Sequence, residues 1–143
     1  MNRVAIVTEL KRDEGLRLKP YKDSVGKTTI GVGRNLDDVS ITELEAEHLL
    51  ANDIAVACAE LDRECPWWIT RPDDAQRAMV NMVFQLGIGR FMGFKKMIAC
   101  LQAGDYIGAS NNALQSKWAE QVPSRAHRIA AMFRNCATTG VTS

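Results

Sequence analysis

The chain has 143 residues, of which 46% are hydrophobic and 24% are charged, as in ordinary water-soluble folded domains. A chain of this length buries roughly two-thirds of its unfolded surface, so it can form a core without disulfides or a structural metal. This composition excludes disordered, collagen-like and disulfide-scaffold classes. No apolar run approaches the ~20 residues of a membrane-spanning helix, so no stable membrane insertion is expected.

Charge is unevenly distributed along the chain, although the net charge is only +1. Residues 1–72 hold 10 Lys and Arg against 13 Asp and Glu, whereas residues 73–143 hold 8 against 4. The basic second half favours an anionic partner, for which a cell-wall polymer and a nucleic acid fit equally well on charge alone. A solvated basic helix surface would produce the same excess.

The first 15 residues indicate a helix and no export signal. Apolar residues from Val4 to Leu16 fit one face of a first helix or its exit, and Gly15 is a natural stop. The apolar stretch meets charge at Glu9 before any cleavage site with small residues, so it does not qualify as a signal peptide. We therefore expect the chain to remain in the cytoplasm in which it is made.

The next elements are a small hairpin and a long helix. Residues 16–33 alternate in polarity and contain a turn at residues 24–26, which predicts a β-hairpin. Thr42 and Glu45 form a capping-box pattern at the start of a long helix that Pro66 ends.

The rest of the chain is expected to be helical. One helix is predicted from Thr70 to a stop at Gly87, and three more at about 94–103, 105–114 and 124–135. Together these elements predict an α+β fold that is mostly helical, with a small N-terminal hairpin lobe joined by a long helix to a helical lobe. A ligand is expected in the cleft between two such lobes.

Two carboxylates stand out as candidate catalytic groups. Glu14 lies at the C-terminal end of the first helix, where the helix dipole disfavours negative charge. Residues that are locally unfavourable in this way are expected at functional sites. Asp23 opens the hairpin turn, and Thr29 follows on the returning strand. Each acid alone also fits a harmless structural role, at a frayed helix end or as a turn acceptor. Two carboxylates with a hydroxyl that holds a water between them are the apparatus of glycoside hydrolysis.

Other motifs carry less weight. The Gly-x-Gly at 31–33 lacks the third glycine of a dinucleotide-binding loop, and Trp67 and Trp68 fit either sugar stacking or the core. The four cysteines are widely spaced and are expected to be reduced, and neither histidine has a metal-ligand spacing. No cofactor and no metal is expected.

Three short segments surround the candidate acids: DEGLRLK at 13–19, YKD at 21–23 and TIGVG at 29–33. Together they resemble the catalytic region of phage-type lysozymes, the endolysins of glycoside hydrolase family 24. Further segments resemble the helical lobe of that family in the same order: NMVFQLG at 81–87, GF at 93–94, SKW at 116–118, Gln121, Pro123 and RAHR at 125–128. The resemblance covers about residues 4–135.

This resemblance implies a lysozyme-like fold in a single domain, residues 1–143. Its small sheet lobe would cover about 14–40, its linking helix about 42–65 and its helical lobe about 66–143, with the first helix packed on the helical lobe. It also implies that Glu14 is the general acid and that Asp23, with Thr29, directs the attacking water, with inversion at the anomeric carbon.

The resemblance further implies contacts to substrate from the helical lobe. Arg125 is expected to pair with Glu14, Gln85 to border the cleft, and Phe84 and Asn112 to contact sugar. The sequence departs from the family at Arg34, where a histidine is common, and in an abbreviated stretch between Leu36 and the long helix.

By this resemblance the chain is an endolysin muramidase that cleaves the β-1,4 bond between N-acetylmuramic acid and N-acetylglucosamine in bacterial peptidoglycan. It would act as a monomer and would bind no nucleic acid. It would remain in the host cytoplasm until a separate holin-like protein permeabilises the membrane and gives it access to the wall. Two alternatives stay open: a lytic transglycosylase, which needs one acid/base Glu and no water-directing Asp, and a non-catalytic peptidoglycan-binding protein.

Overall fold

The computed structural model describes residues 1–139, and in it the chain forms two compact units. The first, here called the sheet unit, is Met1–Leu49, and the second, the helical unit, begins at Leu50. The boundary falls inside a long helix, α2 (Glu43–Glu64), so α2 contributes its first turns to the sheet unit and the remainder to the helical unit.

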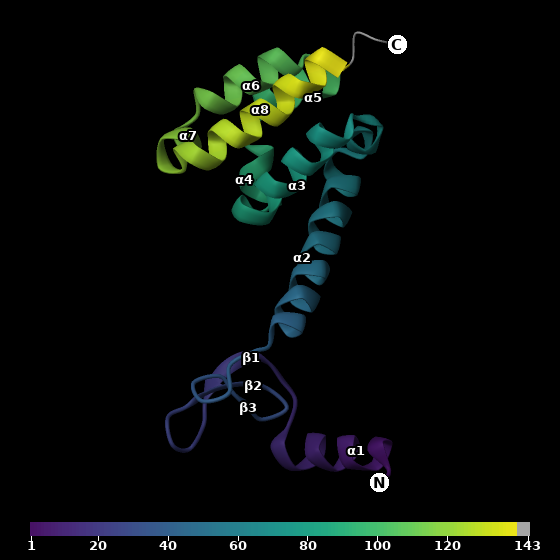
Figure 1. The fold of residues 1–143 in the computed structure, drawn as a ribbon, viewed down its shortest axis with the longest axis vertical. Coiled ribbons are helices and arrows are strands. Elements are labelled where there is room, and N and C mark those ends of the chain that lie inside the picture. Colours follow the sequence, from purple (N-terminus) through teal and green to yellow (C-terminus); the bar gives the residue numbers. More distant parts are fainter. Residues whose placement is uncertain (140–143) are drawn as a thin grey trace. The chain divides into compact units, whose positions relative to one another are not determined.

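The sheet unit begins with helix α1 (Arg3–Glu14), which confirms the first expected helix (Figure 1). The side chain of Asn2 caps its start by accepting a hydrogen bond from the Ala5 amide at 3.0 Å. Gly15 ends it with φ +77°, a conformation that glycine adopts without steric cost, and its amide donates to the Lys11 carbonyl.

A three-stranded antiparallel sheet follows, in the order β1 (Arg17–Lys22), β2 (Thr28–Gly31), β3 (Arg34–Asn35). Strands β1 and β2 are the expected hairpin, whereas the two-residue β3 was not expected. The β1–β2 register is irregular between Arg17 and Tyr21, where Pro20 has no amide to donate to a neighbour. Proline is tolerated there because β1 is an edge strand.

The capping box at the start of α2 is confirmed. The Thr42 hydroxyl accepts from the Glu45 amide at 3.1 Å, and the Glu45 carboxylate accepts from the Thr42 amide at 2.9 Å. Two backbone donors that the first helical turn leaves unsatisfied are therefore both paired.

The helical unit contains the rest of α2 and seven further helical segments among the described residues. They are the 3-10 helix η1 (Pro66–Thr70), α3 (Asp73–Leu86), α4 (Ile88–Met92), α5 (Lys95–Ala103), α6 (Tyr106–Leu114), α7 (Lys117–Gln121) and α8 (Pro123–Thr139). The expected helix start at Thr70 is wrong, because Thr70 ends η1. Arg71 is extended, with φ −82° and ψ 159°, as a following proline favours, so α3 starts only after Pro72.

The core lies among the helices of this unit, with α8 packed against α3 and α6 (Figure 1). Its largest fully buried side chains include Phe91, Phe133 and Leu61. Trp68 also belongs to the core, and its indole donates to the Asp62 carboxylate at 2.7 Å. Within residues 1–139, no helix is both long enough and apolar enough to cross a bilayer.

A charged cluster orders the loop between β3 and α2 in the sheet unit. The Arg34 guanidinium donates to both Glu45 carboxylate oxygens, at 3.0 and 2.9 Å, and to the Ser40 carbonyl at 2.9 Å. Ser40 has φ +64°, rare for a residue with a side chain, and the Arg34 contact holds it there. Arg34 and the Thr42 amide lower the pKa of Glu45 to about 2.

The ion pair between Arg34 and Glu45 predicts a pH-dependent contribution to the free energy of unfolding. Because the folded-state pKa of Glu45 is depressed, its stabilisation is complete above the ordinary carboxyl pKa and is lost as pH falls toward about 2. We expect Glu45→Gln to lower the melting temperature at neutral pH, and the difference from the parent protein to vanish near pH 2. Thermal unfolding followed by circular dichroism at several pH values measures this. Glu47→Gln is the control, because Glu47 is exposed on the same helix. Equal shifts in the two variants would contradict the prediction.

Candidate active site

Glu14 is the last residue of α1, and its carboxyl group lies against the backbone of Gly33. A β-carbon placed on Gly33 would lie 2.8 Å from Glu14 Oε2 and 3.1 Å from Glu14 Cδ, distances at which one of the groups must move. Gly33 occurs in the turn between β2 and β3 with φ +66°. The absence of a side chain at this position is therefore what makes room for the Glu14 carboxyl.

Asp23 closes the turn between β1 and β2 with one carboxylate oxygen. Its Oδ1 accepts from the amides of Val25 and Lys27, at 3.0 and 2.8 Å, and the Asp23 amide donates to the Lys27 carbonyl at 2.9 Å. The turn-acceptor role is therefore real. Its Oδ2 has no hydrogen-bond partner among the described residues, which leaves one oxygen able to accept a proton or a water.

Thr29 lies in the middle strand of the sheet, paired with Tyr21 on one side and Asn35 on the other. Its side chain is buried, at 3% exposure, and its hydroxyl donates to the Lys27 carbonyl at 3.1 Å. The only hydroxyl proton is thus used, so Thr29 Oγ1 can act toward a further partner only as an acceptor.

The structure links two of the three expected catalytic residues through one backbone residue. Lys27 donates its amide to Asp23 and accepts the Thr29 hydroxyl at its carbonyl. Glu14 belongs to the same unit and lies against the turn that follows Thr29's strand. The backbone of Lys27 and the α-carbon of Gly33 were both missed from the sequence as parts of the site. The Gly-x-Gly at 31–33, two residues after Thr29, was the available signal for Gly33.

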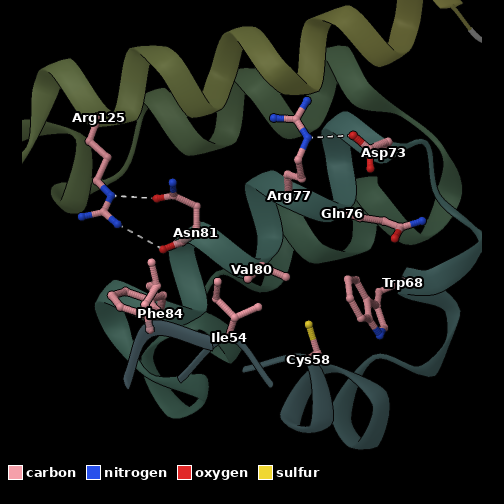
Figure 2. A pocket seen from close by; sticks show the side chains of 11 residues that line it. Ile54, Cys58, Trp68, Asp73, Gln76, Arg77, Val80, Asn81, Phe84 and Arg125 are labelled. Atoms are coloured by element: carbon pink, nitrogen blue, oxygen red, sulfur yellow. Dashed lines mark hydrogen bonds and ion pairs between the residues drawn. The ribbon is translucent and has the colours of Figure 1, made fainter. Parts of the chain in front are cut away.

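Of the four expected substrate-binding residues, Phe84 and Arg125 line the same cavity of the helical unit, about 530 Å³ in volume (Figure 2). Arg125 donates to the side-chain oxygen of Asn81 at 2.8 Å and to its carbonyl at 3.3 Å. Ile54 and Val80 contribute apolar surface to this cavity. The expected Arg125–Glu14 pair would join the two units and stays a prediction.

The other two, Gln85 and Asn112, belong to a different part of the helical unit. Gln85 Oε1 accepts from the Trp118 indole at 2.9 Å, and Asn112 donates to the Gly108 carbonyl at 2.8 Å. Asn112 and Trp118 line a second cavity of about 580 Å³. Phe94 packs its ring edge-to-face with Trp118 there, with centroids 6.0 Å apart. Four cations surround this cavity: Arg90, Lys95, Lys96 and Lys117.

Among residues 1–139, no three or more His, Cys, Asp or Glu side chains gather closely enough to hold a metal ion. Burial raises the pKa of the Cys65 and Cys58 thiols, which keeps them protonated and weakly nucleophilic. The reactive groups of the candidate site are thus the two carboxyl groups and the threonine hydroxyl.

Comparison with known proteins places these residues in a family context. The family model described as phage lysozyme matches residues 11–133. The chain is 36% identical to an endolysin of Acyrthosiphon pisum secondary endosymbiont phage 1, over 78% of this chain and 75% of that protein. It is 29% identical to probable T4-type lysozyme 1 of Dictyostelium discoideum, over 87% of this chain and 90% of that protein. It is also 32% identical to the pre-baseplate central spike protein Gp5 of Enterobacteria phage T4, over 84% of this chain but only 26% of that longer protein.

Gly33→Ala tests the contact with Glu14, and Gly31→Ala is its matched control. Both glycines have positive φ, +66° and +70°, so both variants are expected to lose about 1–2 kcal/mol of unfolding free energy. A β-carbon at Gly31 meets no atom within 4 Å, whereas one at Gly33 collides with Glu14. We expect only Gly33→Ala to shift the side-chain NMR signals of Glu14. Similar shifts in both variants would argue against the contact.

Proposed function

Since this chain belongs to the phage lysozyme family, glycoside hydrolase family 24, and is therefore a hydrolase of the lysozyme type, we propose that it is an endolysin acting on bacterial peptidoglycan. The bond it cleaves in this proposal is the β-1,4 link between N-acetylmuramic acid and N-acetylglucosamine. The observation that carries the proposal is a pair of acceptor oxygens, Asp23 Oδ2 and Thr29 Oγ1. The other carboxylate oxygen of Asp23, Oδ1, already accepts from the amides of Val25 and Lys27, and the Thr29 proton is donated to the Lys27 carbonyl.

Glu14 is the general acid in this proposal. Its carboxyl group has a defined place against Gly33 at the end of α1. A general acid must donate a proton to the glycosidic oxygen as the bond to the anomeric carbon breaks, and a carboxyl group can do this. The defined position and the carboxyl chemistry support assigning the leaving-group proton to Glu14.

Asp23 and Thr29 direct the attacking water. Because Thr29 gives its hydroxyl proton to Lys27 and ionised Asp23 has no proton to give, a water between them donates one hydrogen to each. Its two lone pairs then point away from both residues, and one of them is available to attack an incoming sugar. This geometry favours a water nucleophile over direct attack by Asp23, since direct attack gives Thr29 no task.

The reaction then balances as a hydrolysis with inversion. Glu14 protonates the leaving oxygen as its bond to the anomeric carbon breaks, and water forms the new carbon–oxygen bond on the opposite face. Asp23 takes the proton that the water loses. A β-linked substrate therefore gives an α-configured product.

The helical unit supplies the rest of the substrate contacts in this proposal. Phe84 and Arg125 share one cavity, and Asn112 lines the other, whose basic rim suits an anionic wall polymer. Gln85 contributes by orienting Trp118. We also propose that the protein acts as a monomer and remains in the host cytoplasm until a separate holin-like protein permeabilises the membrane.

Glu14→Gln is expected to abolish peptidoglycan cleavage, because an amide has no proton to give to the leaving oxygen. The free energy of unfolding should stay within about 1 kcal/mol of the parent value, since the change removes a charge that the helix dipole disfavours. Clearance of purified cell walls, followed by turbidity, measures the loss. Glu9→Gln, an exposed carboxylate on the same helix, should keep full activity. Substantial clearance by Glu14→Gln would refute the acid assignment.

The products of digestion separate the proposed reaction from its rivals. Mass spectrometry should find muropeptides with reducing ends, and NMR of the first product formed should show the α anomer. A lytic transglycosylase would give 1,6-anhydro products instead, and a binding protein would give none. A β-configured first product would mean retention, with Asp23 as the nucleophile.

A further inference from the structure

We propose that Asp37 is a positioning residue for the water-directing hydroxyl of Thr29, acting through the peptide group that joins Lys27 to Thr28. Asp37 Oδ2 accepts a hydrogen bond from the Thr28 amide at 2.9 Å. The carbonyl of that same peptide group, on Lys27, accepts from the Thr29 hydroxyl at 3.1 Å. This inference rests on the proposed hydrolytic function.

The argument depends on the rigidity of one peptide unit. The Lys27 carbonyl and the Thr28 amide lie in one plane and point in opposite directions, because the peptide bond is planar and trans. The carboxylate of Asp37 at the amide end therefore acts together with the Asp23 amide, which donates to the same carbonyl at 2.9 Å, to fix the direction of the carbonyl end. With that carbonyl fixed, the Thr29 proton has one partner, and the oxygen lone pairs keep one orientation.

The same contact strengthens the hydrogen bond at the other end. A charged acceptor on the amide polarises the peptide group and makes its carbonyl a better acceptor. The Thr29 proton is then held more firmly by Lys27, so Thr29 meets a water only as an acceptor. This is the role that the proposed mechanism requires of it.

Neighbouring contacts hold Asp37 in place. The Leu36 amide donates to the Thr28 carbonyl at 2.8 Å, so residues 36 and 37 hold both backbone groups of Thr28. Asp38, next in sequence, bonds instead to the Lys27 ammonium at 3.2 Å and to the Asn35 amide group at 2.9 Å. Asp38 thus lies in the same loop without touching the backbone peptide group that orients Thr29.

Kinetics on soluble glycan strands of purified peptidoglycan test this role. We expect Asp37→Ala to lower kcat about tenfold, part of the 10²–10⁴-fold effect of a complete acid–base group, with KM changed less than about twofold. Asp37→Asn should keep most of the activity, because its amide oxygen can still accept from Thr28. Asp38→Ala should stay within about twofold of the parent protein.

A double-mutant comparison separates positioning from general destabilisation. In a Thr29→Val background, which lacks the hydroxyl, Asp37→Ala should change kcat less than about twofold, because its target is gone. An equal loss of kcat in both backgrounds, or full activity of Asp37→Ala alone, would overturn the proposal. An inactive parent protein, or an active Glu14→Gln variant, would instead count against the proposed function.

Amide hydrogen exchange gives a readout that does not depend on catalysis. The Thr28 amide should be protected in the parent protein and in Asp38→Ala, and less protected in Asp37→Ala. A Thr28 amide that exchanges freely in the parent protein would overturn the proposal whatever the kinetics show.

Discussion

The turn from Asp23 to Lys27 is the constraint on which the candidate site depends. It is closed by a carboxylate that accepts two backbone amides, so the folding of the turn and the placement of Asp23 are a single event. The carbonyl of Lys27 then fixes the hydroxyl of Thr29 on the next strand. Asp23 therefore closes the turn with Oδ1, and in the proposed mechanism it binds the attacking water with Oδ2.

The helical unit provides stability, and it separates the expected substrate contacts. Helices α3 and α6 pack against α8, and the aromatic, aliphatic and methionine side chains between them form the core. Arg125 and Asn112 lie on the outer parts of this unit and line different cavities. In the proposed function, these two cavities hold separate stretches of one glycan chain.

Local signals in the sequence predicted the longer elements well. The capping box at Thr42 and the glycines after α1 and α3 act through their own backbone geometry, so their neighbours matter little. The five-residue helices α4 and α7 and the two-residue β3 were missed, because such short segments have no periodicity to detect. The late start of α3 follows from Pro72, whose effect on Arg71 outweighed the apolar pattern.

The residues of the candidate site also include some that the sequence could identify and some that it could not. Glu14, Asp23 and Thr29 could be named as candidates because glycoside hydrolysis uses side chains of these types, and because the segments that contain them resemble the phage lysozyme family. The peptide group of Lys27 could not, since every residue has the same backbone atoms and only the fold selects one of them. The partners of Arg125 and Gln85 lie 44 and 33 residues away in the chain, a separation at which sequence pattern carries no information on contact.

The edge of the sheet has a consequence for how the protein behaves at high concentration. An exposed edge strand offers unpaired backbone groups to other chains, which is a common route to aggregation. Strand β1 carries Lys19, Lys22 and a proline, and its register is irregular, while the opposite edge, β3, is only two residues long. Neither edge is a good template for another strand. Both edges therefore resist pairing with a second copy of the chain as the protein concentration rises.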